Sequence, residues 1–70
     1  MTLKEASVGL EYTIKSVQTL DEELNTFLFS LGCYEGQPIT IIRALRGGFV
    51  VAIKDARYTI DKELAEAILV

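Results

Sequence analysis

The residues of this 70-residue chain with the most reactive side chains are one cysteine and a scatter of carboxylates. Cys33 lies in the stretch LGCYEGQPITII (residues 31–42), which also holds two glycines and the only proline. A thiol becomes a nucleophile when a base or cation lowers its pKa, and the sequence contains no histidine to do so. Because Cys33 follows a predicted helix, the negative end of the helix dipole would raise its pKa. We therefore expect Cys33 to be buried and unreactive.

The carboxylates are poorly spaced for catalysis or metal binding. Glu22 and Glu23 are neighbours and point in different directions on a helix, so they do not act as a pair. Glu63 and Glu66 offer at most a weak site for a hard cation or iron, and an exposed acidic face is the simpler interpretation. Gly47-Gly48 lacks the lysine and following helix of a phosphate-binding loop. The sequence thus predicts no catalytic residue, no metal site and no cofactor, and hence not an enzyme.

The first half of the chain predicts a strand followed by a helix. Leu10, Tyr12 and Ile14 alternate with polar residues, which is typical of a strand near residues 10–17 with one buried face. An apolar stripe then predicts a core-facing helix over residues 21–31, and its members are Leu24, Phe27, Leu28 and Leu31. Either a capping box of Thr19 with Glu22, or Asp21, begins this helix, and Gly32 ends it in a left-handed conformation.

The second half predicts short strands joined by tight turns. Residues 37–43 form a β-branched run with Pro38 at its entrance, and Gly47-Gly48 supplies the positive φ angles of a hairpin. The next strand places Phe49, Val51 and Ile53 on one face. A turn at Asp55-Ala56, a strand over residues 57–60, a helical turn capped by Asp61 and a strand over residues 67–70 complete the chain. We expect one mainly β domain over residues 1–70, a small and strongly bent β-barrel with one inserted α-helix and a short C-terminal helical turn.

Two features of the sequence could serve binding. Three tyrosines, Tyr12, Tyr34 and Tyr58, together with Phe49 form either an aromatic groove for a peptide or, as we favour, part of the core. Residues 36–60 are basic, whereas the whole chain has a net charge of −3. This basic segment either guards strand edges, which is the simpler interpretation, or meets an acidic partner; its members are Arg43, Arg46, Lys54 and Arg57, against Asp55 alone.

The composition also limits where the protein acts. A negative net charge argues against nonspecific binding to nucleic acid, and we expect no nucleic acid partner. No apolar run reaches the roughly 18 to 20 residues that cross a bilayer, so we expect no direct membrane insertion. The chain begins at Met1 without a basic and apolar leader, and one cysteine forms no internal disulfide, so we expect a cytoplasmic protein.

Over its whole length the chain resembles the FeoA family, the small cytoplasmic component of bacterial ferrous iron transport. The matching residues, in order, are Met1-Thr2-Leu3-Lys4-Glu5 with Gly9, Glu23-Leu24, Leu28, Leu31-Gly32, Gly36, Ile39, Ile41, Arg43, Gly47-Gly48, Val51, Ile60, Ala65 and Ile68-Leu69-Val70. The resemblance implies an SH3-like β-barrel and a non-enzymatic adaptor or regulator that docks on FeoB, the iron permease with a cytoplasmic GTPase domain. Glu35 replaces a proline that is usual in the family, and Cys33 occupies a usually apolar position.

The candidate partner-binding residues follow from their predicted positions in turns. They are Arg43, Arg46 and Phe49 at the hairpin, and Tyr34 and Glu35 at the turn after the helix. An alternative function is a metal-responsive SH3-like module that binds a transition metal ion, because similar domains follow the DNA-binding parts of iron- and manganese-dependent repressors. No DNA-binding helix pair fits beside these strands in 70 residues, so we do not expect the chain alone to be a repressor.

Overall fold

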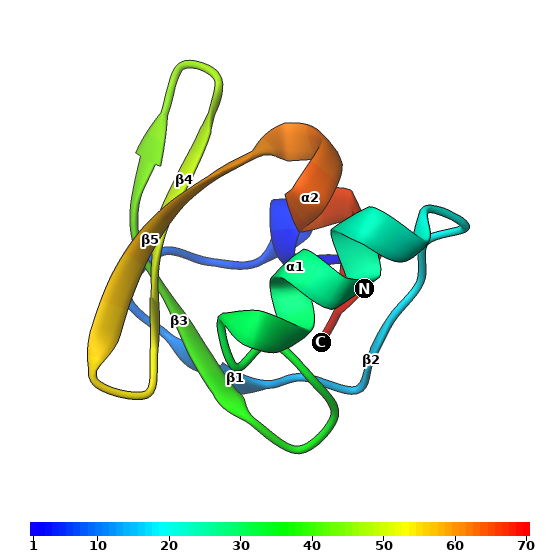
Figure 1. The fold of residues 1–70 in the computed structure, drawn as a ribbon. Coiled ribbons are helices and arrows are strands. Elements are labelled where there is room, and N and C mark those ends of the chain that lie inside the picture. Colours follow the sequence, from blue (N-terminus) through cyan, green and yellow to red (C-terminus); the bar gives the residue numbers. More distant parts are fainter.

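The structure is a computed structural model that describes residues 1–70 (Figure 1). Short strands dominate, and the longest helix has nine residues. In chain order the elements are the 3-10 helix η1 (Leu3–Glu5), β1 (Glu11–Thr13), β2 (Ser16–Val17), α1 (Glu22–Ser30), β3 (Pro38–Leu45), β4 (Gly48–Ile53), β5 (Ala56–Asp61), α2 (Lys62–Ala67) and β6 (Ile68–Leu69). The predicted mainly β fold with one inserted helix and a short C-terminal helix is confirmed.

The strands form two antiparallel sheets. The larger sheet has the order β1-β3-β4-β5, and the smaller one pairs β2 with β6. The single strand predicted over residues 10–17 is wrong, because the chain leaves the large sheet after Thr13 and enters the small one at Ser16. Ile14 lies between the two and is held by Gln37 and Gly36, since its N–H donates to Gln37 and its carbonyl accepts from Gly36. The predicted closed barrel is therefore two sheets that enclose one core.

The core is built from the inner faces of both sheets and from the short helices. Phe49, Val51 and Ile53 of β4 all point inward, as their alternation predicts. Leu3 of η1 and Ala65 of α2 close the core from the side of the termini. The predicted burial of Leu10 is wrong: its side chain is 57% exposed, because β1 begins only at Glu11.

Helix α1 begins and ends as the sequence predicts, but it packs differently. The Asp21 carboxylate accepts from the N–H groups of Glu23 and Leu24, so Asp21 is the cap and Thr19 is not. At the other end Gly32 has a φ of 91°, and the N–H of Cys33 reaches the Leu28 carbonyl at 2.9 Å, as in a Schellman motif.

The apolar stripe of α1 is only partly buried. Leu28 is fully buried, Leu24 and Leu31 are half-buried, and Phe27 remains 48% exposed. Phe29, outside the stripe, is 64% exposed. Figure 1 shows α1 crossing in front of the strands with one side open. The predicted core-facing stripe is thus wrong at Phe27, because the short helix rests on the core through one turn.

The glycines of the hairpin between β3 and β4 were predicted to supply positive φ angles, and this prediction is wrong. Positive φ angles occur at Gly9, Gly32 and Gly36, and neither Gly47 nor Gly48 has one. Gly48 is instead required by close packing: a Cβ atom there would lie 2.0 Å from the Ile60 carbonyl oxygen. That oxygen belongs to the backbone of β5 and has no room to move aside.

We predict that Gly48→Ala destabilises the protein by about 3 kcal/mol or more, since the new methyl group overlaps the β5 backbone. Urea unfolding followed by circular dichroism measures the change. Gly47→Ala is the matched control, because a Cβ atom at residue 47 meets nothing within 4 Å, and its effect should stay within about 0.5 kcal/mol. Equal effects of the two substitutions would contradict the packing argument.

Candidate functional site

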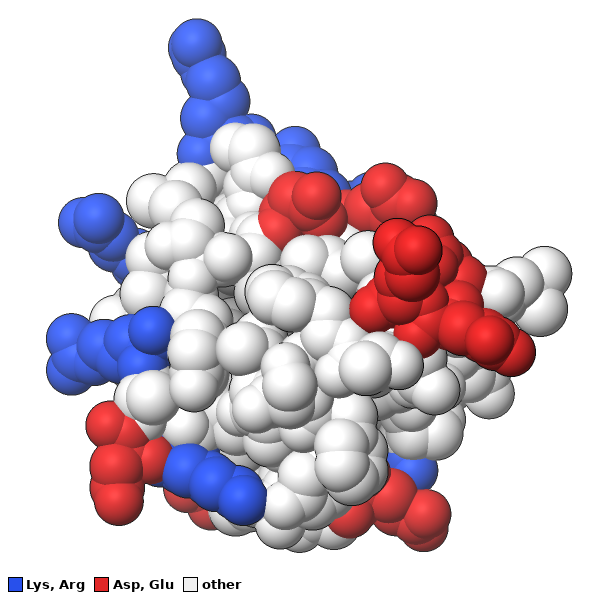
Figure 2. Space-filling model, in the orientation of Figure 1, with Lys and Arg blue, Asp and Glu red and all other residues white.

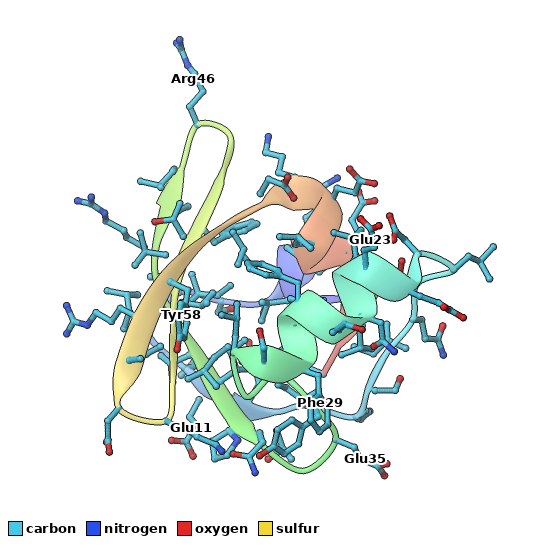
Figure 3. All side chains as sticks on the ribbon, in the orientation of Figure 1. Glu11, Glu23, Phe29, Glu35, Arg46 and Tyr58 are labelled. Carbon is cyan, nitrogen blue, oxygen red and sulfur yellow. The ribbon has the colours of Figure 1, made fainter.

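The residues predicted to contact a partner do not form one cluster. Arg46 extends from the tip of the β3–β4 hairpin, whereas Glu35 lies at the opposite end of the molecule (Figure 3). Arg43 is exposed on β3, and Tyr34 is half-buried in the turn that follows α1. The structure therefore separates the hairpin candidates from the turn candidates.

Phe49 is not available to a partner, so its prediction as an exposed contact is wrong. Its side chain is 9% exposed and belongs to the hydrophobic core. The reason is the register of the hairpin: Gly48 is already the first residue of β4, and Phe49 pairs with Ile60 of β5 as an inward-facing residue. The turn itself is confined to Arg46 and Gly47.

Two basic residues of the second half, Arg43 and Arg57, share the outer face of the large sheet, whereas Arg46 lies at the hairpin tip and Lys54 lines the groove described below. Arg43 is opposite Val50, and Arg57 is opposite Ala52, so both lie in register with the outward positions of β4. Figure 2 shows basic side chains along one side of the molecule and a group of acidic side chains on the other. We call Arg43, Arg46 and Arg57 the basic face. The sheet register places Arg43 and Arg57 on one surface, and Arg46 extends from the hairpin tip.

Cys33 is buried, as predicted, with 1% of its surface exposed. Burial raises the pKa of its thiol to about 11, because the charged thiolate loses its contact with water. The sequence argument had the direction right but named the helix dipole, whereas desolvation is the cause. A protonated thiol inside the core is neither a nucleophile nor a ready metal ligand.

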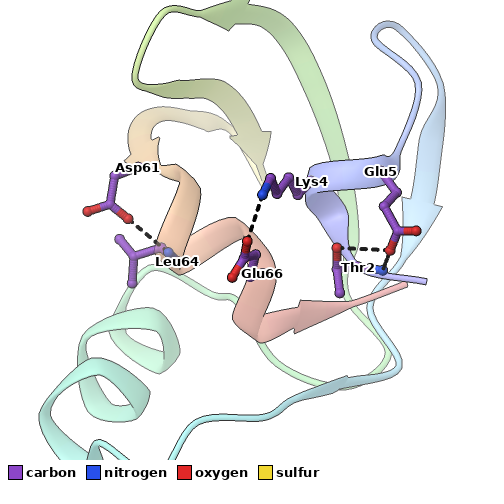
Figure 4. Close-up of polar contacts among 6 residues, drawn as sticks. All are labelled: Thr2, Lys4, Glu5, Asp61, Leu64 and Glu66. Carbon is purple, nitrogen blue, oxygen red and sulfur yellow. Dashed lines mark hydrogen bonds and ion pairs between the residues drawn. The ribbon is translucent and has the colours of Figure 1, made fainter.

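Several carboxylates take part in structural contacts. Lys4 of η1 lies 2.7 Å from Glu66 of α2, and the Asp61 carboxylate accepts from the Leu64 N–H at the start of α2 (Figure 4). The Thr2 backbone N–H donates to Glu5, and this bond lowers the pKa of that carboxyl. No three His, Cys, Asp or Glu side chains come together where they could hold a metal ion. The ion pair with Lys4 separates Glu66 from the weak site that the sequence suggested for it with Glu63.

A groove lies between α1 and β5, a feature that the sequence offered only as the less favoured interpretation of its tyrosines. Its first part, about 420 Å³, is lined by Phe29 and Tyr34 on one side and by Lys54 and Tyr58 on the other. The rings of Phe29 and Tyr34 are 4.9 Å apart, and the Lys54 ammonium donates to the Tyr34 hydroxyl at 2.9 Å. Lys54 also has a φ of 55°, which is uncommon for a residue other than glycine.

The groove answers the open question about the tyrosines. Tyr34 and Tyr58 line it, and Tyr58 also packs against the core, as Tyr12 does. The Tyr12 hydroxyl accepts from the Ser7 N–H. The aromatic residues thus divide between core and groove. Phe29 was the missing member, because its position outside the apolar stripe of α1 gave no signal of contact with β5.

We predict that Cys33 makes stability fall as the pH rises above about 8.5, the pKa of an unfolded thiol. Between there and a pKa of about 11 the unfolded chain releases a proton that the folded chain retains, so the slope reaches about 1.4 kcal/mol per pH unit. Urea unfolding at several pH values, compared with Cys33→Ala, measures this difference. Parallel curves for the two proteins, or rapid alkylation of native Cys33, would contradict a buried thiol.

Solved structures with a similar fold include several FeoA proteins. A crystal structure of an iron uptake regulatory protein, FeoA, superposes with a TM-score of 0.86 at 20% identity and covers 97% of this chain and 91% of that chain. FeoA from Stenotrophomonas maltophilia in complex with zinc, which is described as a procaryotic SH3 domain protein, has a TM-score of 0.88 at 20% identity and covers 99% and 87%. The predicted SH3-like fold is therefore confirmed, with two sheets in place of a closed barrel.

A manganese-dependent transcriptional repressor also matches, with a TM-score of 0.84 at 21% identity over 97% of this chain and 39% of the repressor. This likeness is one of fold. No protein among the curated sequences matches the chain. The model of the FeoA domain matches residues 1–70. This match covers the whole chain, so the chain belongs to the FeoA family.

Proposed function

We propose that the protein is a small cytoplasmic adaptor or regulator of bacterial ferrous iron transport that docks on the FeoB permease through its GTPase domain. The observation that carries this proposal is the FeoA domain match over residues 1–70. The protein has no catalytic activity of its own in this proposal, and its effect is exerted by binding. No helix of the chain has the length and hydrophobicity required to span a bilayer.

The chemistry of the side chains supports binding over catalysis. Cys33 is protonated and buried, and Glu66 is paired with Lys4. These were the groups that the sequence offered for nucleophilic or metal chemistry. Cys33 is thus unavailable for nucleophilic chemistry, and one oxygen of Glu66 is engaged by Lys4.

The basic face supplies a surface for an acidic partner. Arg43, Arg46 and Arg57 are all exposed, and none of them takes part in the one ion pair of the chain, which joins Lys4 to Glu66. Unpaired cations on one surface attract an acidic surface over several ångströms and speed its association. We propose the basic face as the electrostatic part of the docking surface.

We predict that the double substitution Arg43→Glu and Arg46→Glu weakens binding to the soluble GTPase domain of the cognate FeoB. At low salt we expect about a tenfold loss of affinity, which shrinks as salt rises. Calorimetry gives the affinity, and a ¹⁵N NMR titration maps the surface. Lys15→Glu combined with Lys62→Glu is the charge-matched control, since both lysines are exposed and lie outside the large sheet.

Two results would contradict this proposal. If the protein shows no interaction with the GTPase domain, the proposed docking on that domain is wrong. Equal losses for the Arg43→Glu, Arg46→Glu variant and for the Lys15→Glu, Lys62→Glu variant would show that net charge, and not the basic face, controls the encounter.

A further inference from the structure

We propose that the groove between α1 and β5 binds an extended peptide segment, which adds to the free edge of β5 as an antiparallel strand. The segment has alternating apolar side chains, a cation at its amino end and an anion at its carboxyl end. This inference goes beyond the proposed function, because it rests on the groove alone and does not depend on which protein supplies the segment.

The edge of β5 is open to a further strand. β5 is the last strand of the large sheet and pairs with β4 alone. None of the backbone hydrogen bonds formed by turns, loops and caps involves residues 56–60. The opposite edge strand, β1, has three residues, whereas β5 has six. A free edge of this length is a template for strand addition, in which main-chain hydrogen bonds supply affinity.

Two separate hollows border the inner side of β5, and the second is also lined by Leu45 and Gly48 of the β3–β4 hairpin. The first, of about 420 Å³, lies beside Ala56 and Tyr58, and the second, of about 440 Å³, lies beside Thr59, Ile60 and Asp61. Together they follow the whole of β5, which as an extended strand is roughly 17 Å long. A segment of about six residues matches this length.

Helix α1 forms the opposite wall of both hollows. Phe29 lines the first hollow and Phe27 the second, and Figure 3 shows Phe29 near the last turn of α1 and Tyr58 on β5. These two phenylalanines are 64% and 48% exposed, so the wall is apolar and uncovered. Alternate apolar side chains on an added strand would fill the space beside them.

The direction of the strands fixes which side chains of the segment face the groove. Every strand pair of the chain is antiparallel, and an added strand of the same direction extends this pattern. Ala56, Tyr58 and Ile60 occupy the inward positions of β5, in register with Ile53, Val51 and Phe49. The residues that pair with Tyr58 and Ile60 therefore point toward α1, and these are the apolar positions of the segment.

Charges at the two ends of the groove set the polarity of the segment. Lys54 lies in the turn before β5 and lines the first hollow, where its ammonium donates to the neutral Tyr34 hydroxyl. The adjacent Asp55 lines neither hollow, and Asp61, at the end of β5, lines the second. Neither Lys54 nor Asp61 forms an ion pair. The amino end of an antiparallel segment comes to Asp61 and its carboxyl end comes to Lys54. Charge complementarity thus favours a segment with a cation at its amino end and an anion at its carboxyl end.

The test is a ¹⁵N NMR titration of the full chain with the peptide KVTVTFE and with its charge-reversed partner EVTVTFK. We expect KVTVTFE to shift the amide signals of residues 54–61 and 27–34, with EVTVTFK about fivefold weaker at low salt. N-methylation of one alternate set of peptide amides should abolish binding, and methylation of the other set should leave it unchanged. Only the first set faces β5 in an added strand.

Variants of the protein test whether the peptide binds in the groove or elsewhere on the surface. Phe29→Ala should weaken the binding of KVTVTFE about tenfold, because it removes an apolar wall of the groove. Since Phe29 is mostly exposed, the substitution should have little effect on folding. Leu10→Ala, at a similarly exposed residue outside the groove, should have no effect. Asp61→Asn keeps a helix-capping side chain and removes the charge, and it should reduce the preference for KVTVTFE over EVTVTFK.

The proposal is overturned by any of three results. One is the absence of shifts along β5 when the peptide is present in excess. Another is equal tolerance of methylation on both sets of amides. The third is shifts confined to Arg43, Val50 and their neighbours, which would place the peptide on the outer face of the sheet. Failure of FeoB docking would leave this proposal intact, since the probes are the two peptides alone.

Discussion

The structure depends on the pairing of its first and last residues. The Val70 N–H donates to the Met1 carbonyl at 2.9 Å, and β2 pairs with β6. We call these pairings the seam. Beside the seam η1 packs against α2, and Leu3 of η1 is fully buried in the core. Contacts between residues so far apart in sequence require closure of nearly the whole chain, which carries a large loss of conformational entropy. The buried aliphatic side chains beneath the seam offset that loss.

Once the seam is closed, the large sheet has three different surfaces. Its inner face is covered by the core, its outer face carries Arg43 and Arg57, and its β5 edge faces the groove beside α1. Electrostatic attraction acts over several ångströms but selects little for the shape of the partner. A strand edge with two hollows selects a segment by its length and its direction. A protein of this size can thus attract a partner by one surface and select a segment by another.

Sequence reasoning succeeded where the governing interaction is local. The caps at Asp21 and Asp61, the left-handed Gly32 and the alternation of β4 all depend on residues a few positions apart. It failed where distant segments decide. Phe29 lines the groove beside β5 only because the fold places α1 there. Phe49 is buried because of the hairpin register, which the paired glycines in the sequence do not determine. The candidate site could not be predicted, because its walls come from segments that only the fold brings together.

The core contains no buried polar side chain, and this has an evolutionary consequence. Aliphatic residues such as Ile41 and Val51 contribute volume without fixed hydrogen-bond partners, so one can replace another if the total volume is kept. Mutations of this kind accumulate with little loss of stability. Divergence by such interchange explains how structures can share the fold at TM-scores of 0.86 and 0.88 while only 20% of residues remain identical.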